Sequence, residues 1–187
     1  MPSAFEKDFY RYVGSSYQNF STKLRYVPFT PGIVYIYFFR KAQTSRFSLI
    51  RALSRGLLQI TKIITGIQIP VETHIGYGFR ILHFGTIVIN PEAKIGNNFT
   101  IAQGALIGGD AGKRKGFPTI GNNCMQCANS IIVGGVTIGN NVLIAPGAFI
   151  NFDVPDNSIV IGNPGKNIPR DESPTKKHIV YSSDDII

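Results

Sequence analysis

The feature that most constrains this chain is a six-residue period of aliphatic residues between positions 75 and 150. The first run, broken by one two-residue insertion, consists of Ile75, Ile81, Ile87, Ile95, Ile101 and Ile107. The second run keeps the period strictly and consists of Ile120, Gln126, Ile132, Ile138, Ile144 and Ile150. A helix repeats every 3.6 residues and a strand every two, so neither explains the spacing. The pattern predicts a hexapeptide repeat.

A period of six suits short flat strands that meet at regular corners. Each turn buries its leading side chain against the turns above and below, so that the stack forms one continuous core. Small or apolar residues follow the leaders of the second run by four positions: Cys124, Ser130, Val136, Val142 and Ala148. Glycine after the leaders, and Asn pairs such as Asn97 and Asn98, tolerate tight corners. We therefore predict a mainly β fold, a parallel β-solenoid.

Three stretches of the chain carry a family resemblance. They are ILHFGTIVIN, the loop GGDAGKRKGFPTIGNN, and the ending NVLIAPGAFINFDVPDNSIVIGNPGKNI. With them, the segment from Ile75 to Ile168 resembles the left-handed β-helix of hexapeptide acyltransferases. The resemblance is strongest to serine acetyltransferases and to the O-acetyltransferases of capsule and O-antigen. It implies left-handed winding, acetyl-CoA as donor, and a homotrimer with sites between subunits.

The chain before and after the repeat has a different character. Helical spacing and stop signals predict helices over residues 3–13, 30–43 and 47–65. The segment after Lys166 loses the period and is rich in Pro, Ser and mixed charge, which predicts a flexible or loosely docked tail. We expect a helical region over residues 1–66, a β-helix over 67–168 and a tail over 169–187.

The formal charge of +8 favours anionic partners. No nucleic-acid motif accompanies it, so we expect a phosphate-rich cofactor rather than nucleic acid. The aromatic helix predicted over residues 30–43 is expected to pack on the solenoid base and a neighbouring subunit. The alternative is peripheral association with the inner face of a membrane, because apolar residues stand beside the cations Arg40, Lys41, Arg46, Arg51, Arg55 and Lys62.

Two cysteines, Cys124 and Cys127, stand in a CxxC spacing without a second pair. A buried thiol at Cys124 is expected rather than a zinc site, because the hexad register turns this residue inward. The first residues carry charges where a secretory signal needs an apolar run. These features predict a cytoplasmic protein.

A general base is expected among three histidines. His178 falls in the aperiodic tail, and His74 precedes a leader and should face outward. His83 stands two places after Ile81, where a side chain should leave the solenoid surface. By the resemblance, His83 matches the histidine that deprotonates the acceptor hydroxyl. Two histidines, His74 and His83, are too few for the metal site of a hexapeptide carbonic anhydrase, so we expect no metal.

A glycine-rich basic loop interrupts the period between Ile107 and Ile120. Glycines let a backbone approach a ligand, and cations bind phosphate; the residues concerned are Gly108, Gly109, Lys113, Arg114 and Lys115. The resemblance places this loop in the wall of the acetyl-CoA groove and over the His83 of a neighbouring subunit. It also places Ala128, Ala145 and Pro146 along the pantetheine arm and Lys166 near the phosphates.

Three positions differ from the serine acetyltransferase pattern. This chain has Gln68 and Leu82 where that branch has acids, and Phe117 where it has a second histidine. Gln68 or Glu72 is expected to orient His83, and Phe84 or Phe117 to contact the acceptor. We therefore hypothesise O-acetylation of a carbohydrate acceptor, a sugar hydroxyl of a surface polysaccharide or its precursor. The alternatives are serine O-acetylation and a non-catalytic hexapeptide scaffold.

Overall fold

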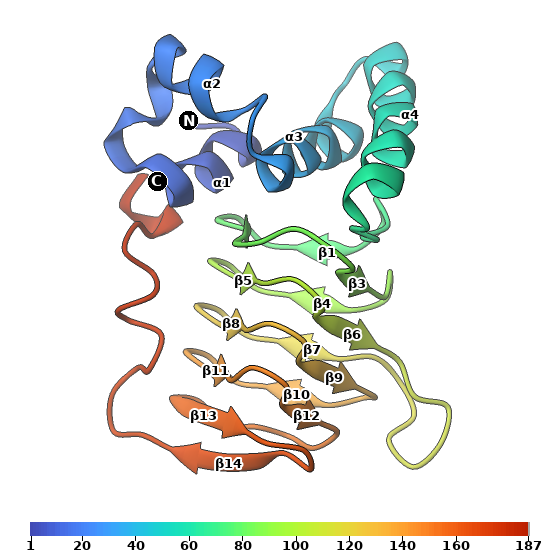
Figure 1. Ribbon diagram of the computed structural model, residues 1–187, viewed down its shortest axis with the longest axis vertical. Coiled ribbons are helices and arrows are strands. Elements are labelled where there is room, and N and C mark those ends of the chain that lie inside the picture. Colours follow the sequence, from blue (N-terminus) through green and yellow to red (C-terminus); the bar gives the residue numbers. More distant parts are fainter. Residues whose placement is uncertain (187) are drawn as a thin grey trace.

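The computed structural model describes residues 1–186 and shows a stack of β-coils with helices at one end (Figure 1). The helical elements are α1 (Ala4–Val13), the 3-10 helix η1 (Gly14–Gln18), α2 (Phe20–Tyr26), α3 (Pro31–Thr44) and α4 (Ser48–Thr65). Three of them lie where the sequence predicts helices. The short α2 is not anticipated, because seven residues show too little of a helical period. The expected division of the chain into three parts remains a prediction.

Three sheets form the sides of the solenoid. The first contains β1 (His74–Ile75), β4 (Lys94–Ile95), β7 (Thr119–Ile120) and β10 (Thr137–Ile138). The second contains β2 (Arg80–Ile81), β5 (Thr100–Ile101), β8 (Met125–Gln126), β11 (Leu143–Ile144), β13 (Ser158–Ile161) and β14 (Lys166–Pro169). The third contains β3 (Val88–Ile89), β6 (Leu106–Gly108), β9 (Ile131–Val133) and β12 (Phe149–Ile150). All strand pairs are parallel except that of β13 with β14.

The predicted register of the repeat is confirmed. Every leader of both runs is at most 5% exposed, and every residue four places after a leader in the second run is at most 3% exposed. Gln126, the one polar leader, is also buried, and its amide nitrogen donates to the carbonyls of Leu106 and Ser130 at 3.2 and 3.1 Å. These backbone bonds allow an amide in an aliphatic column.

The corner between the first and second sheets is an asparagine ladder. Asn98, Asn123 and Asn141 each adopt φ of 57°, a left-handed conformation that asparagine tolerates. Their side chains connect successive coils, as in the 3.1 Å bond from Asn98 Nδ2 to Asn123 Oδ1. The corner therefore favours asparagine for two reasons: the residue tolerates the left-handed backbone, and its amide bonds to the next coil.

The top of the solenoid is closed by side chains from the helices. The hydroxyl of Tyr12 donates to the carbonyl of Ile81 at 2.9 Å and accepts from its N–H at 2.8 Å. The hydroxyl of Tyr35 does the same for Ile69, at 2.9 and 3.1 Å. Arg11 donates to the carbonyl of Gly78 at 2.8 Å. These groups replace the partners that another coil would supply.

A buried ion pair forms part of this closure. Arg40 Nε lies 2.7 Å from Asp8 Oδ2, and both side chains are at most 5% exposed. Arg40 also donates to the carbonyls of Ile75 and Gly76, while Asp8 accepts the N–H of Phe79 at 2.8 Å. Arg40 is therefore not one of the surface cations that the sequence suggested.

The bottom of the solenoid is closed by the chain itself. After β13 the chain reverses, and β14 pairs with it in antiparallel register from Ser158↔Pro169 to Ile161↔Lys166. The tail then runs back along the asparagine corner towards α1 (Figure 1). Thr175 donates to the carbonyl of Asn123 at 2.8 Å, and the N–H of Ser183 donates to Asn98 Oδ1 at 2.8 Å. The tail is thus hydrogen-bonded to the coils at several points, at Arg170, Thr175 and residues 182–184.

Helix α4 has an unusual distribution of side chains. Only Ser54, Leu58 and Thr65 are buried. Its exposed apolar residues are Leu49, Ile50, Leu53, Leu57, Ile60, Ile63 and Ile64, each at least 40% exposed. Over the described residues, no helix combines the length and the apolar character that crossing a bilayer requires. Most of the apolar surface of α4 is therefore turned away from the rest of the chain.

Candidate active site

His83 lies at the corner between the second and third sheets, in the turn from β2 to β3. Its side chain is exposed, as the sequence predicts, and so are His74 and His178. It opens into a cavity of about 440 Å³, here called the His83 cavity. The cavity is lined by Phe29, Thr30, Pro31, Leu82, His83, Phe84 and Gln103. Of the two predicted aromatic contacts, only Phe84 belongs to it.

The start of α3 forms the upper wall of the His83 cavity. Gly32 packs so closely on β2 that a Cβ there would lie 3.0 Å from Cβ of Ile81. Thr30 and Pro31, which line the cavity, are fixed by this contact. The hydroxyl of Tyr12 also hydrogen-bonds to the N–H and the carbonyl of Ile81. The residue from which the His83 turn begins is therefore fixed in position.

Below His83 the same corner forms a column through the lower coils. Backbone bonds connect Gly104 to Gly85, Asn129 to Gln103, and Gly147 to Ala128. The predicted pantetheine residues Ala128, Ala145 and Pro146 lie on this column and are half-buried or exposed. Four coil steps separate β2 from β13, about 19 Å at the usual strand spacing. Lys166 follows the last of these turns and is exposed.

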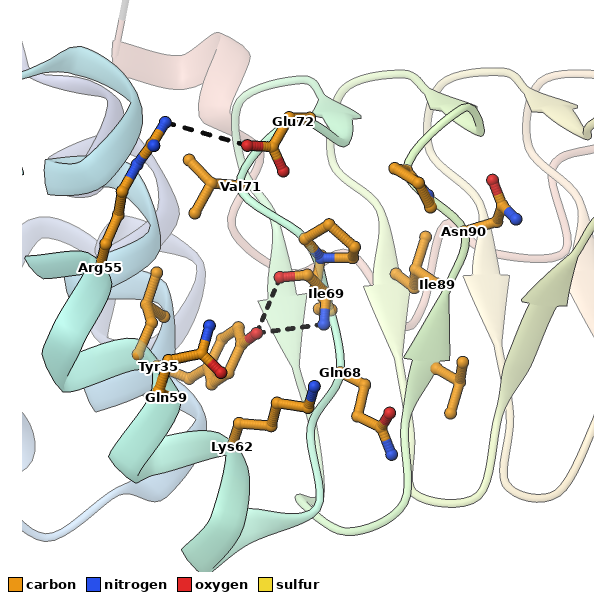
Figure 2. A pocket seen from close by; sticks show the side chains of 14 residues that line it. Tyr35, Arg55, Gln59, Lys62, Gln68, Ile69, Val71, Glu72, Ile89 and Asn90 are labelled. Atoms are coloured by element: carbon orange, nitrogen blue, oxygen red, sulfur yellow. Dashed lines mark hydrogen bonds and ion pairs between the residues drawn. The ribbon is translucent and has the colours of Figure 1, made fainter.

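Gln68 and Glu72 line a different cavity, of about 490 Å³, between α4 and the first coil (Figure 2). Gln68 forms a bridge with Val88, and Glu72 lies 3.8 Å from Arg55 of α4. Neither residue lines the His83 cavity, and the contacts described for them are with Val88 and Arg55 instead of His83. The structure therefore does not bring these two residues to the base within one subunit.

The basic loop, residues 109–118, leaves the solenoid at the corner between the third and first sheets. A bridge between Asp110 and Gly116 closes its neck. Backbone N–H groups of Gly112 and Arg114 hold the pKa of Asp110 below its usual value. Lys113, Arg114 and Lys115 are exposed, and Arg114 lies 3.1 Å from Asp153. This corner is not the one that carries His83.

Phe117 belongs to the basic loop and packs against Gly109, where a Cβ would lie 2.6 Å from its ring. A side chain at position 109 would clash with this ring, so packing within the subunit is enough to require glycine there. Phe117 is 44% exposed and does not line the His83 cavity. Any contact between Phe117 and an acceptor at His83 would need a second subunit.

The thiol of Cys124 is buried as the register predicts, whereas Cys127 is half-buried. Cys124 is fully buried, and burial raises its pKa to about 12. Burial also raises the pKa of the half-buried Cys127. Both groups stay protonated at neutral pH, which makes them poor nucleophiles.

The chain matches known proteins over the repeat and beyond it. The family model "Bacterial transferase hexapeptide (six repeats)" matches residues 117–151. Serine acetyltransferase of Helicobacter pylori strain 26695 is 34% identical over 143 residues, which cover 75% of this chain and 83% of that protein. Serine acetyltransferase of Bacillus subtilis strain 168 is 38% identical over 116 residues, or 61% of this chain. The chain spans about half the length of the Bacillus relatives.

Solved structures agree over a longer range. Serine acetyltransferase of Neisseria gonorrhoeae superposes with a TM-score of 0.70 at 27% identity, over 94% of this chain and 69% of that chain. The same enzyme in complex with serine superposes with a TM-score of 0.66 at 29% identity, over 87% and 66%. The likeness therefore includes the helices as well as the coils.

These findings correct the acceptor inferred from sequence. The hypothesis of a sugar hydroxyl in a surface polysaccharide is wrong, because the relatives and the solved neighbours are serine acetyltransferases. That hypothesis assumed that Gln68, Leu82 and Phe117 replace two acids and a histidine that together form one serine pocket. Only Leu82 lines the His83 cavity, so the other two differences do not describe that pocket within a subunit.

Sequence reasoning also missed residues of this site. Gln103 and the segment from Phe29 to Pro31 line the His83 cavity without having been singled out. Gln103 could have been found by aligning successive coils, because Ile81 pairs with Ile101 and each stands two places before a polar residue. The Phe29 segment carries no comparable signal, since it lies more than 50 residues before His83.

Proposed function

The chain belongs to the serine acetyltransferase family of hexapeptide-repeat transferases, and we propose that it transfers the acetyl group of acetyl-CoA to the hydroxyl of L-serine. The observation that carries the proposal is the exposed His83 in its cavity, at the head of the corner column. The similarity to a structure determined in complex with serine supports the acceptor. The left-handed winding implied by the resemblance is part of the proposal.

His83 acts as the general base. Its imidazole takes the proton from the serine hydroxyl as the oxygen attacks the thioester carbonyl. The tetrahedral intermediate then collapses, the carbon–sulfur bond breaks, and the imidazolium returns the proton to the departing thiolate. The products are O-acetylserine and coenzyme A. Neither Gln68 nor Glu72 takes part from within the same subunit.

Acetyl-CoA lies along the corner column. The small side chains of Ala128 and Ala145 leave room for the pantetheine arm beside the coils. Lys166, at the far end, meets the nucleotide phosphates. The second wall comes from the basic loop of a neighbouring subunit, because this loop leaves a different corner of its own subunit.

The protein is a homotrimer in this proposal. A cyclic trimer brings the basic loop of one subunit to the His83 corner of the next, three times. Helix α4 supports assembly, because Ile50, Leu53, Leu57, Ile60 and Ile64 are exposed at alternating spacings of three and four residues. This spacing is the heptad pattern of a helix that packs on another helix.

The cations of α4 fit a protein partner better than a membrane surface. Arg55 and Lys62 line the cavity between α4 and the first coil, and Arg51 lines a neighbouring hollow together with Gln43 of α3. They turn towards their own subunit instead of flanking the apolar face. The cytoplasmic location inferred from sequence stays a prediction.

The activity is tested with purified protein, acetyl-CoA and L-serine, by following free coenzyme A and identifying O-acetylserine by mass spectrometry. The variant His83→Ala should lose about 100- to 10,000-fold in kcat, while calorimetry should find coenzyme A binding retained. His74→Ala, at another exposed histidine, is the matched control. Coenzyme A release without O-acetylserine, or full turnover by His83→Ala, would contradict the proposal.

Donor binding is tested separately with Lys113→Ala, Lys115→Ala and Lys166→Ala. Each variant should weaken coenzyme A binding, and wild-type affinity should fall as salt rises, because exposed charges are screened. Lys177→Ala, in the tail, is the control for loss of charge alone. Unchanged affinity in the combined variant would place the groove elsewhere.

A further inference from the structure

Gln103 lies one coil below His83 and faces the same cavity. Ile81 pairs with Ile101 in the parallel ladder between β2 and β5, so the two turns that follow are stacked. Both His83 and Gln103 line the His83 cavity. Three side chains of the lining are polar, those of Thr30, His83 and Gln103.

The amide of Gln103 has no hydrogen-bond partner among the described residues. Its oxygen Oε1 is buried and unpaired, and no bond holds its nitrogen. This nitrogen, unlike the oxygen, is accessible. A buried polar atom without a partner is rare and calls for an explanation. The buried oxygen lies out of a ligand's reach, whereas the N–H groups of the same amide are accessible and can donate to a ligand in the cavity.

We propose that Gln103 binds the carboxylate of the acceptor serine through its side-chain N–H groups. This inference rests on the proposed function, since it names the contact that serine makes in the same site. Hydrogen bonds to an ionised acceptor are stronger than neutral ones. Gln103 is therefore an acceptor-binding residue, while His83 removes the hydroxyl proton.

The other surroundings of the cavity fit a carboxylate. The lining contains no acidic side chain that would repel it. Thr30 is the N-cap of α3, a 14-residue helix whose start has no side-chain cap. The positive end of that helix faces the cavity and favours an anion. Serine is a zwitterion, and its carboxylate must exchange water for donors on entering such an apolar pocket.

The contact is tested with Gln103→Leu and two acceptors, L-serine and L-serinamide, at saturating acetyl-CoA. Serinamide lacks the carboxylate but keeps the hydroxyl. Gln103→Leu should raise KM for serine roughly 10- to 100-fold and leave KM for serinamide and for acetyl-CoA near wild type. Gln103→Glu should raise KM for serine further, because two carboxylates repel. Gln59→Leu, in the other cavity, is the matched control.

Three results would overturn the inference. An unchanged KM for serine in Gln103→Leu would remove the contact. Equal rises in KM for serine and serinamide would indicate a structural effect. A fall in kcat for both acceptors with unchanged KM would show that Gln103 orients His83 instead. If the wild-type protein forms no O-acetylserine, the proposed function itself fails, and that control separates the two failures.

Discussion

The two ends of the solenoid solve the same problem in different ways. At the top, side chains of the helices pair with the free backbone groups of the first coil, through Asp8, Arg11, Tyr12, Tyr35 and Arg40. At the bottom, the backbone of β14 pairs with β13. The top closure depends on particular side chains, whereas the bottom closure depends mainly on main-chain bonds. Substitutions should therefore affect the two ends unequally.

The largest effect is expected at the buried ion pair of the top. Arg40→Met leaves the carboxylate of Asp8 buried without its partner, which should lower the free energy of unfolding by about 3–5 kcal/mol. Urea unfolding at one fixed protein concentration measures the change.

The double variant Asp8→Leu with Arg40→Met sharpens this test. An isolated buried pair can be replaced by apolar residues at little cost. Here the carbonyls of Ile75 and Gly76 and the N–H of Phe79 would remain unpaired, so the double variant should stay destabilised. Recovery of wild-type stability would mean that the pair does not close the coil.

The tyrosines of the top should give an intermediate effect. Tyr35→Phe and Tyr12→Phe each leave one N–H and one carbonyl of the first coils without a partner, which should cost about 1–3 kcal/mol in free energy of unfolding. Tyr37→Phe is the control on the same helix, since no described residue bonds its hydroxyl. Equal stability of the Tyr35→Phe and Tyr37→Phe proteins would argue against side-chain closure.

The same closure should make the top sensitive to alkaline pH. Burial raises the pKa of Tyr35 from its ordinary value of 10.0 to about 12. The unfolded chain therefore releases this proton at lower pH than the folded chain. The contribution of the Tyr35 hydroxyl to the free energy of unfolding is complete below pH 10 and is lost as pH rises towards 12. At pH 11 Tyr35 should account for a loss of about 1 kcal/mol. Because burial also raises the pKa of Tyr12, the Tyr35→Phe protein should lose that much less than wild type, while Tyr37→Phe should lose as much as wild type.

The smallest effect is expected at the bottom. Asn167 lies on β14 opposite Val160, and its Oδ1 has no partner among the described residues. Asn167→Ala keeps the backbone pairing, so the free energy of unfolding should change by no more than about 0.5 kcal/mol. A loss as large as that of Tyr35→Phe would show that side chains also hold this end.

The sequence predicts the coils far better than the closure of their top. A fixed period of six sets which residues point inward, so Cys124 and Val142 are placed by counting from Ile120 and Ile138. The top closure has no period, because it joins residues far apart, such as Arg11 and Gly78. A pattern of apolar residues cannot indicate which tyrosine or arginine will meet a free carbonyl.

The candidate site shows the same contrast. His83 follows from the register, since the second residue after a leader turns outward. Its expected neighbours Gln68 and Glu72 come from a different segment, and that segment faces α4 instead. The wall from Phe29 to Pro31 depends on how α3 lies on β2, which the residues before the coils do not reveal.

The returning tail changes how the coil stack can come apart. A one-dimensional array of repeats ordinarily frays from either end, because each coil contacts only its neighbours. Here Thr175 and Ser183 are bonded to Asn123 and Asn98, while the same chain continues from β14 at the bottom. Tyr181 packs near Tyr10 of α1, with ring centroids 5.8 Å apart. Opening the last coil therefore loosens contacts at the first, and the stack should melt as one cooperative unit.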